Sequence, residues 1–282
     1  MKISATTVML PEYDLVQTCQ LLQRLGFDGV EWRVRRLAPG QENAAPSAWG
    51  RHLTDLSPEN ILSRAEEVKR VCADHGLGIA GFASACSATD LEQVRLLAEG
   101  AQACGCPAIR LSCPRGYTGE VNYHELYQEA VDAYGQALEI TRKYGVKVLV
   151  EMHGGTIHPS ASLAYRIVSN FPATDIGVIY DPQNMVRDGF ETIPLAIQLL
   201  GDYLAHLHVG AHRPEPAEVD EKGTQKWKWR AVPMGMGLYD FPKLFECLRA
   251  VNYSGYISIE DFAGDRTAEE KLSSGIAYLR SL

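Results

Sequence analysis

The feature that most constrains the fold of this chain is a regular alternation of short apolar segments with longer helical patterns. The short segments are rich in β-branched and other apolar side chains, as strands buried on both faces are. Strands that alternate with helices imply crossover units and a parallel sheet. The segments expected to form strands are Ile3–Val8, Gly29–Val34, Leu77–Ala83, Pro107–Ser112, Val146–Met152, Ile176–Asp181, Leu204–Gly210 and Gly255–Asp261.

The junctions between helical and apolar segments repeat one pattern. A glycine stands between a helical pattern and the next strand in RLGF, DHGL, ACGC and KYGV. Glycine readily takes the left-handed conformation that ends many helices. Ser57, followed by a proline, predicts the start of a helix. Candidate N-caps of other helices are Asp14, Asp90, Ser160 and Asp240.

Eight strand–helix units in 282 residues predict a single (β/α)8 TIM barrel that forms one domain, residues 1–282. The alternative is an open, doubly wound sheet. Such a sheet commonly carries a Gly-x-Gly-x-x-Gly turn after its first strand, and this chain has none there. We therefore favour the closed barrel and expect no nucleotide cofactor.

Two connections are longer than most loops in compact domains. They span Arg35–Leu56 and Ala211–Leu238. Because both follow predicted strands, both are expected at the carboxyl end of the barrel, where the active sites of TIM barrels lie. We interpret them as active-site loops or lids.

Ionisable side chains end four successive predicted strands. Side chains alternate across a strand, so each barrel strand sends one set of them inward. This alternation directs one group from each of the four strands to the same axial level inside the barrel: Glu151, Asp181, His208 and Glu260.

Other polar residues share the inward parity. His153 and His206 are candidate substrate contacts, with pairing to a neighbouring carboxylate as the alternative. Glu31 and Arg110 lie near the ends of other predicted strands. They could form an ion pair with each other, or they could contact the substrate. The same parity rule directs Ala205 outward, under the helices.

Three converging carboxylates would repel each other strongly and lose solvation on burial. A divalent cation removes that problem. Three oxygen donors and one imidazole suit Mn²⁺ best, with Mg²⁺ or Co²⁺ as alternatives. Each of these residues, taken alone, could also be a polar group of the core with satisfied hydrogen bonds. Four such residues at one level favour a metal site.

Charge and cysteine content exclude several other classes. The net charge of -8 and the pI near 5.5 argue against a nucleic-acid surface, which is usually basic. No apolar run is long enough for a signal peptide or a membrane span. The seven cysteines show no zinc-ligand spacing and no disulfide framework. We expect a cytoplasmic protein with reduced thiols.

Longer motifs resemble a known family across essentially the whole chain. They are LLQRLGFDGVEWR (Leu21–Arg33), LVEMHGG, VIYDPQN, HLHVG and the most specific stretch, VPMGMGLYDFPKLFECLRAVNYSGYISIEDF (Val232–Phe262). Together they resemble the xylose isomerase-like barrel superfamily. Within it, they are similar to the sugar phosphate isomerase/epimerase branch, which includes the tagatose/psicose 3-epimerases and the inosose dehydratases.

The resemblance implies roles for particular residues. It places the metal ligands on Glu151, Asp181, His208 and Glu260, and makes the two glutamates the acid and base. The epimerases carry a substrate-binding histidine where this chain has Asn184, and an arginine near Arg213, for which Lys228 or Arg230 are alternatives. The epimerase glutamate shortly after the first ligand is replaced by Gly-Gly-Thr-Ile. These departures argue against assignment to the ketose 3-epimerases specifically.

The implied activity is isomerisation or epimerisation of a sugar or keto-sugar through a metal-stabilised enediolate. The alternative is a metal-dependent dehydratase or lyase that acts on a keto-sugar, keto-glycoside or keto-inositol. A DNA-repair endonuclease would need further metal ligands and a basic face, and a non-catalytic sugar-binding barrel would not need its glutamates. The expected partner is a small carbohydrate, and relatives suggest a homo-oligomer, a dimer or a tetramer.

Overall fold

Eight parallel strands close into a barrel in the computed structural model, which describes residues 1–264 and 266–282. Going round the barrel, the order is β1-β10-β7-β6-β5-β4-β3-β2. The prediction of a (β/α)8 TIM barrel is therefore confirmed. The barrel strands are β1 (Lys2–Thr6), β2 (Gly29–Arg33), β3 (Gly78–Ala83), β4 (Ala108–Arg110), β5 (Lys147–Glu151), β6 (Ile176–Tyr180), β7 (Leu204–Val209) and β10 (Tyr256–Ile259).

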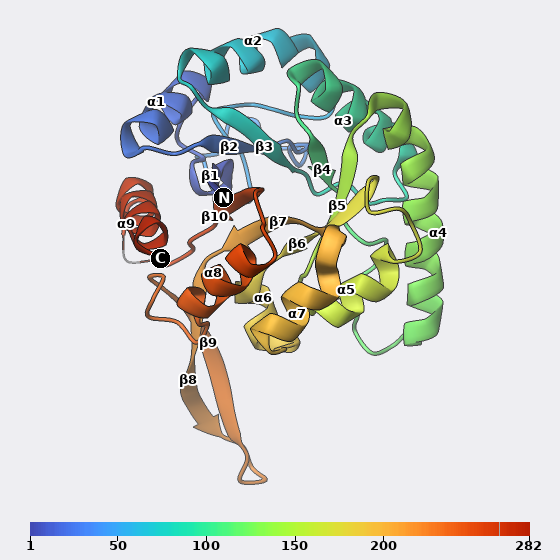
Figure 1. Cartoon of the computed structure of the whole chain (residues 1–282), viewed down its shortest axis with the longest axis vertical. Helices are drawn as coiled ribbons and strands as arrows, with labels where there is room; N and C mark the ends of the chain where they lie inside the picture. Colours follow the sequence, from blue (N-terminus) through green and yellow to red (C-terminus); the bar gives the residue numbers. More distant parts are fainter. Residues whose placement is uncertain (265) are drawn as a thin grey trace.

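Helices surround the strands as an outer layer, and the two chain ends lie near each other beside β1 (Figure 1). The α-helices are α1 (Leu15–Leu25), α2 (Ile61–Asp74), α3 (Leu91–Cys104), α4 (Tyr123–Thr141), α5 (Ala161–Val168), α6 (Pro182–Asp188), α7 (Ile193–Leu200), α8 (Phe241–Ala250) and α9 (Ala268–Ser281). Short 3-10 helices are η1 (Thr7–Met9), η2 (Arg142–Tyr144) and η3 (Gly201–Tyr203). Within the described residues, no helix combines the length and apolarity that a membrane crossing requires.

The helix boundaries follow the expected local signals, with one difference. The glycines of the four junctions all have positive φ, from +82° at Gly26 to +65° at Gly145. Asp14, like Asp90 and Asp240, accepts a backbone hydrogen bond at the start of its helix. Helix α2, however, starts at Ile61 and not directly after Ser57. The carbonyl of Ser57 accepts the first backbone hydrogen bonds, so this residue opens a turn that leads into the helix.

The barrel interior contains a small apolar layer. Ala108, Leu149 and Ile179 form it, and Ala205 packs against them. The outward prediction for Ala205 is therefore wrong. The reason is a register shift between β6 and β7, which inserts Ala205 as an extra residue and turns it inward.

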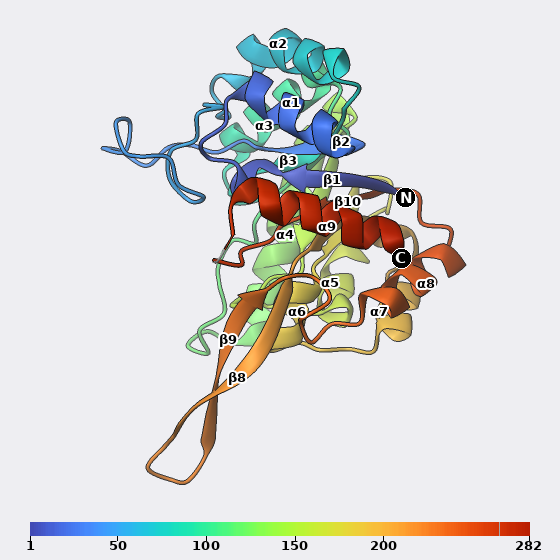
Figure 2. The ribbon, with the colours of Figure 1, turned by 90° about the vertical axis from the view of Figure 1, so that its left-hand side faces the viewer.

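The connection after β7 is an antiparallel hairpin. Strands β8 (Ala211–Val219) and β9 (Gln225–Val232) pair with each other and project away from the barrel (Figures 1 and 2). A loop was expected here. The alternating pattern KWKWRAV suits a strand, and Gly223, with φ of +81°, allows the tight turn between the two strands.

The connection after β2 has almost no regular structure and projects from another part of the molecule (Figure 2, blue). Its position is fixed from inside the barrel, because Arg33 donates to the carbonyl of Gly50 over 2.9 Å. The backbone N–H of Leu53 also donates to the carbonyl of Pro11, over 2.9 Å. These contacts hold Trp49 near the carboxyl end of the barrel.

Candidate active site

Four buried ionisable side chains converge at the carboxyl end of the barrel. One ligand atom from each lies within 4.8 Å of the others. They come from the ends of four strands that are neighbours in the barrel, β5, β6, β7 and β10. The expected juxtaposition is thus present in the structure: Glu151, Asp181, His208 and Glu260.

Asp181 is held in place by the first turn of α6, of which it is the N-cap. Its Oδ1 accepts the backbone N–H groups of Gln183 and Asn184, at 2.9 and 3.2 Å. The Nδ2 of Asn184 donates to Oδ2 over 2.6 Å. The orientation of this carboxylate is therefore fixed by the local fold of the sequence DPQN, and each oxygen keeps lone-pair capacity for a further partner.

His208 bridges two groups of carboxylates. Its Nδ1 lies 3.2 Å from Oε1 of Glu151 and 3.6 Å from Oε2 of Glu260. Its Nε2 lies 3.0 Å from both carboxylate oxygens of Glu31. Because a carboxylate only accepts, both ring nitrogens donate in this arrangement. Against the effect of burial, the charges of Glu31 and Glu260 raise the pKa of His208 well above its usual range. A cation bound at Nδ1 would take the place of the proton there. A carboxylate behind a histidine in this way orients metal-ligating imidazoles in many proteins.

Glu31 and His206 lie beneath the cluster and not in the cavity above it. The Nε2 of His206 is 3.1 Å from Oε2 of Glu31 and 3.1 Å from Oγ of Ser258, which in turn is 2.7 Å from Oγ of Ser4. His206 thus pairs with a neighbouring carboxylate, one of the two roles considered for it. Glu31 and both histidines also form a group that could hold a metal ion. In this structure, however, both imidazoles direct Nε2 at Glu31.

Arg110 forms a buried ion pair with Glu151. The expected alternative, a pair between Arg110 and Glu31, is not what the structure shows, because Glu31 pairs with the two histidines. Strand β4 lies directly beside β5, which brings Arg110 to Glu151. The pair gives Glu151 a fixed orientation as well as a counter-charge.

Burial and mutual repulsion shift the pKa values of the clustered acids. Burial raises the pKa of Glu260 to about 7, against the effect of His208 and reinforced by Glu151. Burial, with Glu151 and Glu260, raises the pKa of Asp181 well above its usual range. Burial acts the same way on Glu151, but Arg110 and His208 outweigh it and lower that pKa.

This donor set fits a divalent cation. Two of the three carboxylates would take up protons more readily than free acids do, which is what closely spaced acids do when no cation lies between them. Three carboxylates and one imidazole whose Nδ1 faces them match the ligand chemistry of Mn²⁺, Mg²⁺ or Co²⁺. An ion bound there would lower the repulsion and keep all three acids ionised.

A cavity of about 390 Å³ opens directly above the cluster. His153 and Asn184, both predicted substrate contacts, line it. The Nδ1 of His153 is 2.7 Å from the carbonyl oxygen of Gly154, so the exposed ring leans over its own turn. The cavity is also lined by Arg35, Trp49, Ala83, Ala85, Arg110, Ser112, Glu151, Gln183, Arg187, His208, His212, Glu260 and Phe262.

Arg213 points elsewhere. It lies on β8 and pairs with Glu215, 3.1 Å away, while the adjacent His212 lines the cavity. Alternation along β8 explains the difference, since neighbouring side chains face opposite sides of a strand. The two alternatives to Arg213, Lys228 and Arg230, also lie near Glu215 on the hairpin.

Several lining residues were not identified from the sequence. Gln183 donates to Oε2 of Glu260 over 3.2 Å, and its own Oε1 is buried without a hydrogen-bond partner. Its position two residues after Asp181, in the first turn of a helix that starts at the carboxyl end of the barrel, is a usable signal. Arg35 and Arg187 carry no such signal, because the side chains that they approach, Trp49 and His212, come from other segments of the chain.

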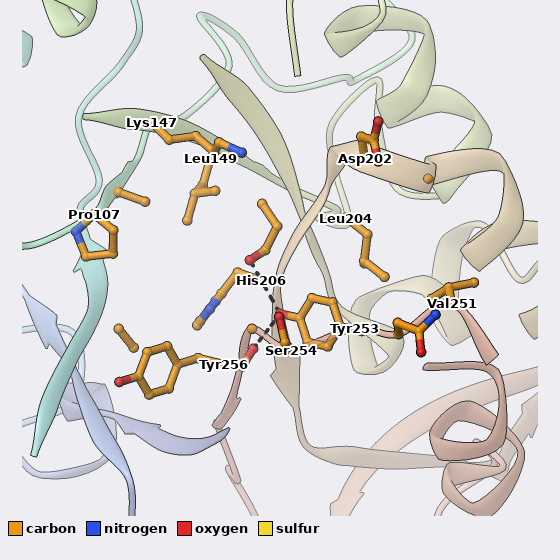
Figure 3. Close-up of a pocket in the computed structure, with 16 residues that line it drawn as sticks. Pro107, Lys147, Leu149, Asp202, Leu204, His206, Val251, Tyr253, Ser254 and Tyr256 are labelled. Carbon is orange, nitrogen blue, oxygen red and sulfur yellow. Dashed lines mark hydrogen bonds between the residues drawn. The ribbon is translucent and has the colours of Figure 1, made fainter. Parts of the chain in front are cut away.

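A second, larger cavity of about 650 Å³ lies at the amino end of the barrel. Figure 3 shows its lining, in which Tyr253 and Tyr256 stand opposite Leu149. The hydroxyl of Tyr253 donates to the carbonyl of Tyr256 over 2.8 Å. This cavity holds no cluster of carboxylates among the described residues, so it offers no comparable chemistry.

A family model matches most of the chain. The chain belongs to the xylose isomerase-like TIM barrel family, whose model matches residues 19–282. A curated relative, the inosose dehydratase of Geobacillus kaustophilus (strain HTA426), is 23% identical over 140 residues. That match covers 48% of this chain and 45% of the relative, so it spans less than half of either protein.

Solved structures share the whole fold at low sequence identity. The 3-keto-D-glucoside 4-epimerase of E. coli superposes with a TM-score of 0.73 at 19% identity, and the match covers 100% of both chains. The IOLI protein, solved with a bound zinc atom, superposes with a TM-score of 0.72 at 17% identity, covering 98% of this chain and 96% of that one. At these identities, the likeness establishes the fold.

Proposed function

We propose that this protein is a divalent-metal-dependent isomerase or epimerase of a sugar or keto-sugar. The observation that carries the proposal is the cluster of three carboxylates and one imidazole at the floor of a sugar-sized cavity. The similarity to a 3-keto-D-glucoside 4-epimerase supports the same class of chemistry. Glu151, Asp181, His208 and Glu260 would hold the metal.

A bound divalent cation would stabilise the enediolate that forms when a proton leaves the carbon beside a carbonyl. The protein itself moves the proton. Glu151 and Glu260 stand at the two ends of the arc of four strands, with Asp181 and His208 between them. Carboxylates that approach from two sides let one remove a proton and the other return it from the opposite face, which inverts the carbon.

The residues around the two glutamates position them. Arg110 holds Glu151 by an ion pair, and Gln183 holds Glu260 by a hydrogen bond. His153 and Asn184 line the cavity and are the proposed contacts to sugar hydroxyls. Glu31 and His206 lie below and support His208, so their proposed role is to position a ligand.

A second candidate is a dehydratase or lyase that acts on a keto-sugar, keto-glycoside or keto-inositol. The similarity to an inosose dehydratase favours it. The same first step applies, but the intermediate then expels a β-leaving group. Which outcome follows depends on the substrate and on the group that protonates the leaving oxygen.

One experiment tests both candidates. Protein loaded with Mn²⁺ is incubated in D2O with a panel of ketoses, 3-keto-glucosides and keto-inositols, and proton NMR follows the substrate. Exchange of a carbon-bound proton for deuterium without loss of water supports the isomerase or epimerase. An unsaturated or dicarbonyl product supports the lyase, and the absence of exchange on every substrate contradicts both.

The assembly and the metal are further parts of this proposal. Mn²⁺ is the expected ion, and metal analysis of protein purified without added metal tests it. A dimer or tetramer is expected from relatives, and sedimentation at several concentrations tests that. All seven cysteines are free thiols, six of them buried, which fits the proposed cytoplasmic location.

A further inference from the structure

We infer that the cavity selects substrates that carry a carboxylate, and that Arg35 and Arg187 hold this group. The inference deepens the proposed function and rests on it, because it names the substrate class of the same site. Both arginines line the cavity. Neither is among the catalytic or metal-ligating residues, and in residues 1–264 and 266–282 neither has a carboxylate oxygen within 4 Å.

Arg35 is partly buried in the cavity wall, and its side chain forms no ion pair within the described residues. Its guanidinium lies 5.4 Å from the ring centroid of Trp49, and its Nε is 3.5 Å from the carbonyl of Ala83. Burial and the neighbouring charges of Arg110 and Arg33 outweigh the opposite effect of Glu151 and Glu260 and lower the pKa of Arg35 to about 10, so the side chain stays charged at neutral pH. A partly desolvated guanidinium of this kind gains most from an anion in the adjacent space.

Arg187 reaches the same cavity from another wall. It belongs to the last turn of α6, and it is close enough to His212, a further lining residue, to lower the pKa of that imidazole together with burial. Within the described residues, its side chain makes no ion pair or hydrogen bond, so its guanidinium is available to a ligand. Two unpaired arginines therefore face one space.

The charges of the site leave these two arginines uncompensated. The carboxylates of Glu151, Asp181 and Glu260 carry three negative charges at most. A divalent cation and Arg110 offset all three. Among the charged side chains that line the cavity, Arg35 and Arg187 then remain without an ion-pair partner, and an anionic substrate would balance them.

The shape of the site favours a carboxylate over a phosphate. Planar guanidinium groups form bidentate pairs with carboxylates and with phosphates, so the backbone donors near them decide between the two. Phosphate sites in barrels commonly use the free N–H groups at a helix N-terminus. At α6, the helix that starts in this cavity, Asp181 already accepts the N–H groups of Gln183 and Asn184, so that position is taken.

The rim supplies an apolar surface for the rest of the ligand. Trp49 and Phe262 both line the cavity, with ring centroids 5.5 Å apart. Sugar rings present a C–H face that packs on aromatic side chains. A sugar acid would thus place its ring against these two residues and its carboxylate between the arginines.

The test measures binding and not turnover. Isothermal titration of Mn²⁺-loaded protein, at fixed ionic strength, compares D-glucuronate with the neutral D-glucose and with D-glucose 6-phosphate. Wild-type protein should bind glucuronate about tenfold or more tightly than glucose. Arg187→Gln and Arg35→Gln should each weaken glucuronate binding by about tenfold and leave glucose binding unchanged, and Arg187→Lys should restore part of the loss.

Matched variants keep the test interpretable. Arg70→Gln removes an exposed arginine from α2 that pairs with Asp74, and it should change neither affinity. Arg187 is exposed, so its variants are expected to fold even if Arg35→Gln does not. Circular dichroism checks both.

Three outcomes would overturn the inference. They are equal affinity for glucuronate and glucose, no measurable binding of glucuronate, and tighter binding of glucose 6-phosphate than of glucuronate. The proposed function fails separately. Protein that exchanges a substrate proton yet shows no preference for the acid refutes only the inference, whereas a preference for the acid without any exchange refutes the enzymatic proposal.

Discussion

The two mouths of the barrel are both hollow, but they differ in chemistry over a very short distance along the strands. On β5, Leu149 belongs to the apolar layer inside the barrel, and Glu151, two residues further, belongs to the ionisable cluster. On β6, Ile179 and Asp181 repeat this change. On each of these strands, successive inward-facing side chains therefore belong first to the apolar core and then to the ionisable cluster.

The larger cavity is the one without the cluster. It measures about 650 Å³ at the amino end, against about 390 Å³ at the carboxyl end. Tyrosines and apolar residues line it together with Lys147, Asp202 and His206, and the hydroxyl of Tyr253 is satisfied by a backbone carbonyl. Among the described residues, carboxylates with shifted pKa values converge only at the smaller of these two cavities, which favours it as the candidate site although its volume is lower.

The largest expected effect comes from the glutamates at the carboxyl mouth. Glu151→Gln and Glu260→Gln should each slow the exchange of a substrate proton with D2O by about 10² to 10⁴, since each removes a proton-transferring group. Proton NMR measures the rate. The control at the amino mouth is Tyr253→Phe, which should leave the rate unchanged. Equal losses at the two mouths would break the distinction between them.

Glu31, the carboxylate behind the proposed metal site, should have a smaller effect. Glu31→Gln weakens the contact that orients His208, so affinity for Mn²⁺ should fall by roughly tenfold to a hundredfold. Titration of metal-free protein with Mn²⁺ measures it. Glu66→Gln, which changes an exposed residue of α2, serves as control. An unchanged affinity in Glu31→Gln would show that this carboxylate does not support the site.

Substitutions at the amino mouth should change the free energy of unfolding and not the activity. A Cβ on Gly29 would lie 2.7 Å from the carbonyl oxygen of Gly78 and 2.6 Å from the ring of Tyr256. Gly29→Ala should therefore lower the free energy of unfolding by about 1–3 kcal/mol. In Gly81→Ala, the new Cβ would lie 3.6 Å from its nearest neighbour, so little change is expected. Urea unfolding measures both, and a stable Gly29→Ala protein would contradict the packing described.

The smallest effect concerns acid sensitivity near the carboxyl mouth. Burial lowers the pKa of His158 to about 4 from 6.5, and neither ring nitrogen has a hydrogen-bond partner in the described residues. Between these values the unfolded chain binds more protons than the folded one, so stability falls as pH drops through 6.5. At about pH 5.5 the loss should be about 1 kcal/mol. Urea unfolding at two pH values tests it, and the same pH dependence in His158→Phe would argue against this residue as the source.

Local rules were sufficient for much of the fold and for the ligand cluster. Glycine junctions and buried apolar runs located the barrel strands to within one or two residues at most ends. Alternation along the strands then brought Glu151 and His208 to one level, because parallel strands of a barrel end at the same rim. These features depend on neighbours in sequence or on a regular periodicity.

The remainder depends on packing between segments that are distant in sequence. The inward turn of Ala205 follows from a register shift between two strands, which no pattern in one strand shows. The partner of Arg110 depends on which carboxylate the barrel brings closest. Arg35 and Trp49 reach the cavity only because Arg33 fixes the irregular segment that follows β2.

The most direct test of the central claim is the anomalous difference density of a crystal soaked in Mn²⁺. The account predicts one strong peak, about 2.0–2.3 Å from oxygens of Glu151, Asp181 and Glu260 and from Nδ1 of His208. A peak elsewhere in the barrel, or no peak at a concentration that saturates the protein in solution, would contradict it.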